Sequence, residues 1–121
     1  EYLFPICDDK HWAVIKVQLK ERKTTIYDSV NGHNWNEKLT QLHVFLEKVH
    51  HQTFYFEMIK DDVPKQLNCH DCGVHCILTC IHLYFNGCIA YTASQINNCR
   101  IKLCEAMKKE DQTDLIDLIR Q

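Results

Sequence analysis

The feature that most constrains this chain is an apolar, thiol-rich segment that runs from Cys72 to Phe85 without a proline. Asn86-Gly87 follows it and supplies the left-handed residue that commonly ends a helix. A polar stretch, Gln66 to Asp71, comes directly before it. A helix that is apolar on most of its surface is stable when other elements cover it. We therefore predict a buried helix around which the rest of the chain packs.

Three segments before this helix alternate with the period of two that strands show. In His11 to Leu19, one side carries Ile15, Val17 and Leu19. Thr24 to Tyr27 is β-branched and aromatic, and a charged turn joins the two segments, which predicts a hairpin that ends at Asp28. Thr53 to Ile59 alternates again and predicts a third strand, followed by a loop at Asp61 to Pro64.

Helical spacing marks further segments on both sides of the buried helix. A helix is predicted from Asn36, with Asn34 or Asn36 as its N-cap and an apolar face made of Leu39, Leu42, Phe45, Leu46 and Val49. Thr92 to Gln95 has the spacing of a capping box, and the helix after it has an apolar face of Ile96, Cys99, Leu103 and Met107. A last short helix is predicted over Asp114 to Arg120. The order of elements predicts an α+β fold that begins with an antiparallel hairpin.

Length and charge exclude several classes of protein. The chain has 121 residues, and we expect residues 1–121 to form one domain. Its 14 Lys and Arg against 16 Asp and Glu give a formal charge of −2, so no broad basic surface for nucleic acid is expected. No apolar run approaches the length of a membrane span, and Glu1 to His11 lacks the pattern of a signal peptide.

Eight cysteines admit a disulfide scaffold, a metal site or reduced thiols. Cys72, Cys76 and Cys80 recur every four residues on one rigid helical face, where they cannot easily pair with each other. We interpret most of the cysteines as small buried hydrophobic residues in a reducing compartment. Cys69, Cys72, His75 and Cys76 could instead form a zinc knuckle, although no second tight pair follows at zinc-finger distance, so we expect no metal site.

Cys72 stands where a polar loop meets the first turn of the buried helix. Unpaired N–H groups and the helix dipole favour a thiolate there, and Gly73 lets a substrate carbonyl approach the backbone. A nucleophilic cysteine also needs a base and a group that orients the base. His11 and Asp28 are candidates, because one opens a strand and the other ends its hairpin partner. Taken singly, each of these residues also has a purely structural explanation, and we assign Ser29 to the turn.

Taken together, the residues resemble the ubiquitin-like-protein-specific (SUMO- or sentrin-specific) cysteine proteases, which are related to the adenovirus protease. Members of this family read His-Trp at the start of a strand, Tyr-Asp-Ser at the end of the next, and Gln-x-Asn-x-x-Asp-Cys-Gly before a helix. The matching segments here are His11-Trp12, Tyr27-Asp28-Ser29 and Gln66 to Gly73. Several independent pieces in the same order make this resemblance specific.

The resemblance implies a papain-like cysteine peptidase core with an antiparallel sheet packed against helices and the triad order His, Asp, Cys. It implies hydrolysis of peptide or isopeptide bonds after the C-terminal Gly-Gly of a ubiquitin-like modifier such as SUMO, in processing or deconjugation. The implied partners are the modifier and its conjugates, no cofactor is implied, and the location is intracellular, in the nucleus, the cytoplasm or both.

The resemblance also implies a role for each matching residue. Cys72 would attack the scissile carbonyl, His11 would hold the thiolate as an ion pair and protonate the leaving amine, and Asp28 would orient His11. The Cys72 N–H and the Gln66 side-chain amide would hold the oxyanion. Trp12 would wall a narrow tunnel around the two glycines of the modifier, next to Gly73.

Family domains usually carry another, largely helical segment before the histidine, with a second tryptophan that closes this tunnel. We therefore expect residues 1–121 to correspond to the C-terminal, catalytic part of such a domain. Three alternatives stay open: a catalytically weak module that binds a ubiquitin-like modifier, a viral or transposon-type polyprotein protease of the same fold, and, less favoured, a zinc-binding domain.

Overall fold

A four-stranded mixed sheet lies at the centre of the computed structural model, which describes residues 1–54, 58–60 and 63–109. Its strands are β1 (Tyr2–Asp8), β2 (His11–Gln18), β3 (Lys23–Tyr27) and β4 (Met58–Lys60), in that spatial order. β1, β2 and β3 pair antiparallel, and β4 runs parallel to β3. The α+β fold is confirmed, and so is the hairpin of β2 and β3.

β1 was not predicted. It contains Pro5, which cannot donate a ladder hydrogen bond and obscures a strand pattern in the sequence. Proline is tolerated at this place because β1 pairs with β2 alone among the described strands and so lies at an edge of the sheet. The sheet therefore begins one strand earlier than the sequence indicates.

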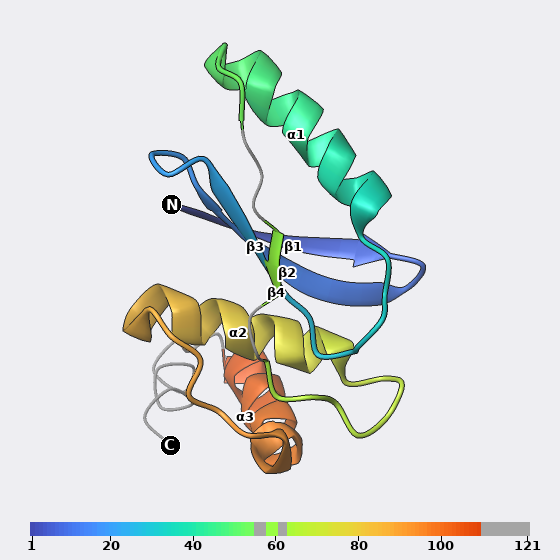
Figure 1. Cartoon of the computed structure of the whole chain (residues 1–121). Helices are drawn as coiled ribbons and strands as arrows, with labels where there is room; N and C mark the ends of the chain where they lie inside the picture. Colours follow the sequence, from blue (N-terminus) through green and yellow to red (C-terminus); the bar gives the residue numbers. More distant parts are fainter. Residues whose placement is uncertain (55–57, 61–62, 110–121) are drawn as a thin grey trace.

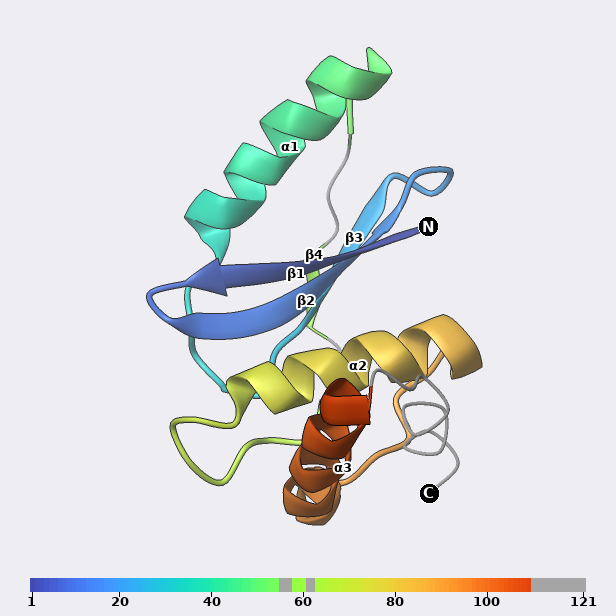
Figure 2. The same ribbon diagram turned by 180° about the vertical axis from the view of Figure 1, so that it is seen from behind.

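Helices cover both faces of the sheet. α1 (Asn36–His50) lies on one face, and α2 (Cys72–Asn86) and α3 (Ile96–Lys109) lie on the other, as Figures 1 and 2 show from opposite sides. The central strand β2 is buried on both faces: Ile15 packs with the residues under α1, and Val14 packs with those of α2. The alternation expected for this strand is confirmed.

α2 is the buried helix that the sequence predicts. Its Leu78 is fully buried and packs in one cluster with Val14 of β2 and Leu103 of α3. The helix ends at Gly87, whose φ of 70° is left-handed and whose N–H donates to the Leu83 carbonyl. The stop expected at Asn86-Gly87 is confirmed.

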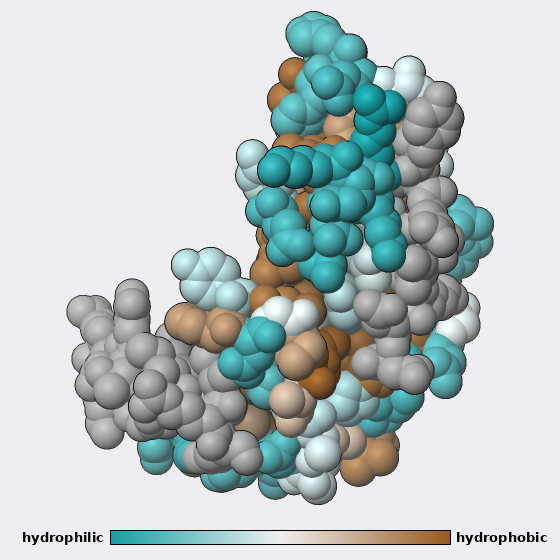
Figure 3. Space-filling view, turned by 60° about the vertical axis from the view of Figure 1, so that its left-hand side comes forward, coloured by the Kyte–Doolittle hydropathy of each residue, from teal (hydrophilic) through white to brown (hydrophobic). Residues whose placement is uncertain are grey.

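α1 differs from its prediction at both its start and its face. Its N-cap is Trp35, whereas the side-chain oxygen of Asn34 accepts the N–H of Asn36, so neither asparagine is the N-cap. Leu39 and Leu46 are buried as expected, but Phe45 and Val49 are exposed. α1 extends beyond the sheet in Figure 1, so part of its apolar face meets no strand. Hydrophobic residues are visible on the surface between the part of the molecule with α1 and the part with α2 and α3 (Figure 3).

The remaining elements agree in part with the sequence. The third predicted strand is confirmed at its end, where β4 covers Met58–Lys60, whereas Thr53 and Phe54, predicted to begin it, lie outside any strand. The predicted capping box at Thr92 and Gln95 is confirmed, although it opens a 3₁₀ turn, Ala93–Gln95, that leads into α3. Met107, expected on the buried face of α3, is exposed. Residues 55–57 of the predicted strand, residues 61–62 of the predicted loop and the whole predicted helix 114–120 lie outside the described residues.

The interpretation of the cysteines as mostly buried is wrong. All eight are free thiols, and three are buried, two are half-buried and three are exposed. The exposed ones lie in the loop before α2, in the turn after it and in α3. Within the described ranges, no group of three or more His, Cys, Asp or Glu residues is placed to hold a metal ion, and no helix is long and apolar enough to cross a membrane.

Candidate active site

A tight turn and a strand end bring His11 and Asp28 together. Asp9 and Lys10 connect β1 to β2 with φ angles of 48° and 62°, the left-handed pair that two-residue hairpin turns use. This turn makes His11 the first residue of β2, opposite Asp8. Asp28 follows β3 directly, and the start of β2 and the end of its antiparallel neighbour β3 meet at one end of the sheet. His11 Nε2 lies 2.6 Å from Asp28 Oδ1.

Asp28 is held by donors on both carboxylate oxygens. The Val30 N–H donates to Oδ1 at 2.9 Å, and the Trp35 indole N–H donates to Oδ2 at 2.8 Å. Lys65 Nζ donates to the backbone carbonyl of Asp28 at 2.9 Å. The sequence did not single out Trp35, although a tryptophan at a helix entrance needs a partner for its N–H once buried. These bonds fix the plane of the carboxylate that faces His11.

His11 is packed as well as hydrogen-bonded. Its ring centroid lies 5.1 Å from that of His33 and 5.7 Å from that of Trp35. His33 Nε2 in turn lies 3.0 Å from Asp8 Oδ2. Since Nε2 of His11 faces Asp28, its Nδ1 is the nitrogen left for a second partner.

Cys72 is the first residue of α2 and is 8% exposed. Its Sγ lies 4.0 Å from the backbone oxygen of Lys10, the residue before His11, so the thiol lies beside the turn that positions this histidine. N–H groups in the first turn of a helix have no partner within the helix and attract negative charge. The structure thus brings Cys72, His11 and Asp28 to the same end of the sheet.

Gln66 lies in the polar loop before α2, and its side chain is bonded at both ends. Its Oε1 accepts a hydrogen bond of 2.6 Å from Ser29 Oγ, and its Nε2 donates to the backbone oxygen of Asn68 at 2.6 Å. Its own N–H donates to the Ser29 carbonyl at 2.9 Å. The loop is anchored further by Asp71, which accepts from the side chain of Asn68 and forms an ion pair with Arg100 of α3. Ser29, assigned to the turn from the sequence, therefore also contacts Gln66.

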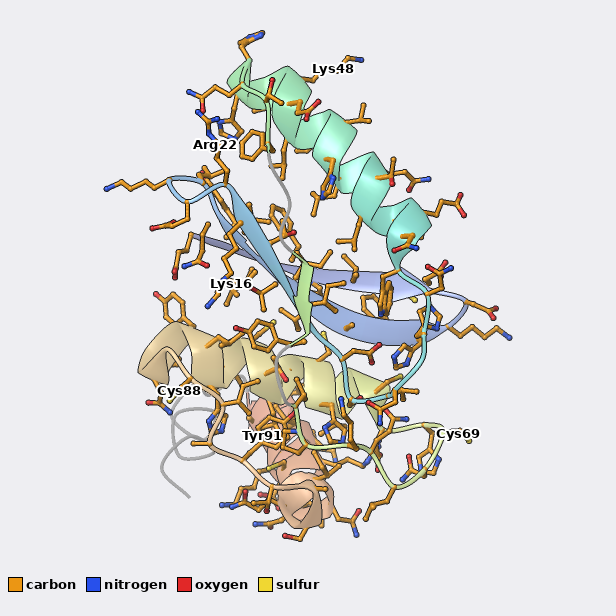
Figure 4. All side chains as sticks on the ribbon, viewed as in Figure 1. Lys16, Arg22, Lys48, Cys69, Cys88 and Tyr91 are labelled. Carbon is orange, nitrogen blue, oxygen red and sulfur yellow. The ribbon has the colours of Figure 1, made fainter. Side chains whose placement is uncertain are left out.

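The thiols near the site differ in their surroundings. Cys69 is exposed in the loop before α2, at the position labelled in Figure 4, whereas Cys72 is buried. A hydrogen bond with Cys80 and burial raise the pKa of Cys76, which keeps it a neutral thiol, and the same bond lowers the pKa of Cys80. Of these cysteines, Cys72 combines a helix N-terminus with a neighbouring His-Asp pair.

Trp12 and Gly73 border an apolar pocket beside Cys72. The pocket has a volume of about 410 Å³ and is also lined by Pro5, Cys76, Ile77, Cys80 and Ile81. Trp12 is 42% exposed, and a Cβ built on Gly73 would meet no heavy atom within 4 Å. The space beside the backbone at Gly73 is therefore open.

A hydrogen-bonded network of uncharged side chains joins α2 to Tyr91, in the segment that follows the helix. Tyr91, labelled in Figure 4, lies with its hydroxyl 3.1 Å from both His75 Nδ1 and Thr79 Oγ1. Burial lowers the pKa of His75 to about 4 and raises the pKa of Tyr91 to about 12. Both side chains are therefore uncharged at neutral pH, which suits their buried position.

The family model "Ulp1 protease family, C-terminal catalytic domain" matches residues 2–115. Comparison with curated protein sequences gives no match. A solved structure of the SUMO protease Ulp1, its catalytic cysteine oxidised to a sulfenic acid, is similar with a TM-score of 0.69 and 25% identity; the match covers 81% of this chain and 48% of that one.

Two further structures are similar. One is the C-terminal Ulp1 protease domain in complex with Smt3, the yeast ortholog of SUMO, with a TM-score of 0.67, 25% identity and coverage of 81% of this chain and 47% of that one. The other is the Chaetomium thermophilum Ulp1-like SUMO protease catalytic domain, with a TM-score of 0.62, 27% identity and coverage of 82% and 42%. The chain thus spans less than half the length of these solved chains. Its fold is Ulp1-like, and by the match over residues 2–115 the chain belongs to the Ulp1 protease family as part of the C-terminal catalytic domain.

Proposed function

We propose that this chain is the catalytic part of a cysteine peptidase that hydrolyses peptide or isopeptide bonds after the C-terminal Gly-Gly of a ubiquitin-like modifier such as SUMO, in processing or deconjugation. The observation that carries the proposal is the 2.6 Å pair of His11 and Asp28 beside the thiol of Cys72, in a chain of the Ulp1 family. The modifier and its conjugates are the proposed partners. Eight free thiols support an intracellular location.

The proposed reaction begins with proton transfer. Asp28 accepts the Nε2–H of His11, which leaves Nδ1 to take the proton of Cys72. The thiolate attacks the carbonyl carbon of the second glycine and forms a tetrahedral intermediate. His11 then gives this proton from Nδ1 to the departing amine, and a thioester remains on Cys72. Water, with His11 as the base, hydrolyses the thioester and regenerates the thiol.

Two donors are proposed for the oxyanion of the intermediate. One is the backbone N–H of Cys72, in the first turn of α2, and the other is the side-chain amide of Gln66. Loss of one such donor typically costs on the order of 10²–10³ in kcat. Trp12 and Gly73 are proposed to bind the Gly-Gly tail, because the open backbone at Gly73 admits a chain that carries no Cβ.

Covalent labelling tests this proposal. The chain is incubated with a panel of ubiquitin-like modifiers that carry a C-terminal thiol-reactive group, and the labelled peptide is identified by mass spectrometry. We expect an adduct on Cys72 with at least one modifier, none in Cys72→Ala, and an undiminished adduct in Cys69→Ala, which removes an exposed thiol three residues away.

Two results would contradict the proposal. An adduct on Cys69 in place of Cys72 would show that exposure alone governs labelling. Binding of a modifier by the wild-type chain with no adduct and no turnover would instead identify a binding module that keeps the fold without the chemistry.

A further inference from the structure

We propose that Ser29 is a positioning residue that holds the side-chain amide of Gln66 in the orientation that donates to the oxyanion. The inference rests on the proposed function. Ser29 directly follows Asp28 and is 3% exposed, although a turn serine is usually solvated. Its Oγ lies 2.6 Å from Gln66 Oε1, and the two residues are 37 positions apart in the chain. A buried hydroxyl with such a distant partner does more than close a turn.

The hydrogen bonds settle which way the amide of Gln66 faces. The backbone oxygen of Asn68 can only accept, so the atom of Gln66 that lies 2.6 Å from it must be the nitrogen. The oxygen of the amide then faces Ser29, whose hydroxyl must donate. Turning the amide over would place two acceptors against each other at Asn68.

This orientation leaves one N–H of Gln66 for a substrate. An amide nitrogen carries two hydrogens, and within residues 1–54, 58–60 and 63–109 the acceptor that it contacts is the Asn68 carbonyl. Because the amide group is planar, fixing the first hydrogen and the oxygen also fixes the direction of the second hydrogen. The last torsion of a glutamine side chain is intrinsically broad, so the direction of this hydrogen depends on the bonds that Ser29 and Asn68 make. Fixed donors stabilise developing charge better than mobile ones.

The backbone supports the same coupling. The N–H of Gln66 donates to the Ser29 carbonyl at 2.9 Å, and Lys65 Nζ donates to the Asp28 carbonyl at 2.9 Å. Two consecutive residues therefore serve the two parts of the site: Asp28 carries the carboxylate that orients His11, and Ser29 binds Gln66, the proposed oxyanion donor.

Steady-state kinetics with a modifier fused to a fluorogenic amine tests the inference. Ser29→Ala is expected to lower kcat by roughly tenfold or more, towards the 10²–10³ expected for Gln66→Ala, with KM changed less than about twofold. In the Gln66→Ala background, Ser29→Ala should change kcat by less than about twofold, because its effect acts through Gln66. The matched control is Thr24→Val, which removes a buried hydroxyl in β3, the strand that precedes Ser29; Thr24 Oγ1 has no hydrogen-bond partner in the described part of the chain.

A spectroscopic measurement separates failure of the inference from failure of the proposed function. The side-chain N–H pair of Gln66 is assigned in ¹⁵N-labelled protein by its loss in Gln66→Ala. We expect Ser29→Ala to shift this pair and speed its hydrogen exchange, and Thr24→Val to leave it unchanged. A pair that does not respond to Ser29→Ala, or additive losses of kcat in the double variant, overturns the inference. If the N–H pair of Gln66 responds to Ser29→Ala but the wild-type chain shows no turnover, the proposed peptidase function is refuted and the positioning of Gln66 by Ser29 is supported.

Discussion

Asp28→Asn is the most informative single substitution, because both oxygens of this carboxylate face groups that can only donate. Oδ1 accepts the N–H of Val30 at 2.9 Å, and Oδ2 accepts the indole N–H of Trp35 at 2.8 Å. An amide replaces one of these oxygens by an NH₂ group. Whichever way the new amide turns, an N–H then faces another N–H.

The two orientations of this amide have different consequences. If its NH₂ group faces Trp35, a buried donor loses its acceptor, which costs about 1–3 kcal/mol of stability. If it faces Val30 and His11, Nε2 of His11 must accept, and the histidine proton moves to Nδ1. That nitrogen can then no longer take the proton of Cys72. The equivalent change in a serine protease triad lowers kcat by about 10⁴.

Two measurements follow. Urea unfolding should show a free energy of unfolding that is lower by about 1–3 kcal/mol in Asp28→Asn. The rate of alkylation of Cys72 by iodoacetamide, measured on the Cys72 peptide by mass spectrometry, should fall by at least about tenfold, because less thiolate is present. Alkylation needs no substrate, so this readout is independent of the choice of modifier.

Asp8→Asn is the matched control. It makes the same chemical change in a neighbouring His-Asp pair, since Asp8 Oδ2 lies 3.0 Å from His33 Nε2, and this carboxylate is 36% exposed against 10% for Asp28. We expect its alkylation rate to stay within about twofold of the wild type. An unchanged rate in Asp28→Asn would refute the assignment of Asp28 as the residue that orients His11.

Three further predictions concern stability and substrate access. Gly73→Ala should raise the free energy of unfolding by about 0.5–1 kcal/mol, since a Cβ there meets nothing within 4 Å, yet reduce labelling by modifier probes; undiminished labelling would show that no tail passes there. Leu78→Ala should cost about 2–5 kcal/mol in urea unfolding because Leu78 is fully buried, whereas Leu67→Ala, at 85% exposure, should cost less than about 0.5 kcal/mol. Burial lowers the pKa of His75 to about 4, below its value in the unfolded chain, so the unfolded state binds the proton more readily. The contribution of neutral His75 to the free energy of unfolding is complete above about pH 6.5 and decreases as the pH falls towards 4. His75→Gln should reduce the difference between the free energies of unfolding at pH 7 and at pH 5, and a difference equal to that of the wild type would contradict this explanation.

Local patterns carry much of the fold. The apolar segment that forms α2, the glycine that ends it and the alternation of β2 all depend on residues within a few positions of each other, and the sequence predicts all three. Elements whose state depends on distant neighbours were predicted less well. β1 carries a proline that its edge position tolerates, and α1 exposes Phe45 and Val49 although their neighbour Leu46 is buried against the sheet.

For the site as well, some features can be predicted from the sequence and others only from the fold. The residues with reactive groups, His11, Asp28, Gln66 and Cys72, stand out in the sequence because their motifs lie in short segments of a known order. Only the tertiary structure decides what holds them: Trp35 on one oxygen of Asp28, and Ser29 on the amide of Gln66. The second contact joins residues 37 positions apart, across a turn and a loop whose approach no local periodicity encodes. Chemical identity is thus readable along the chain, whereas the orientation of each group follows from the partners that folding brings to it.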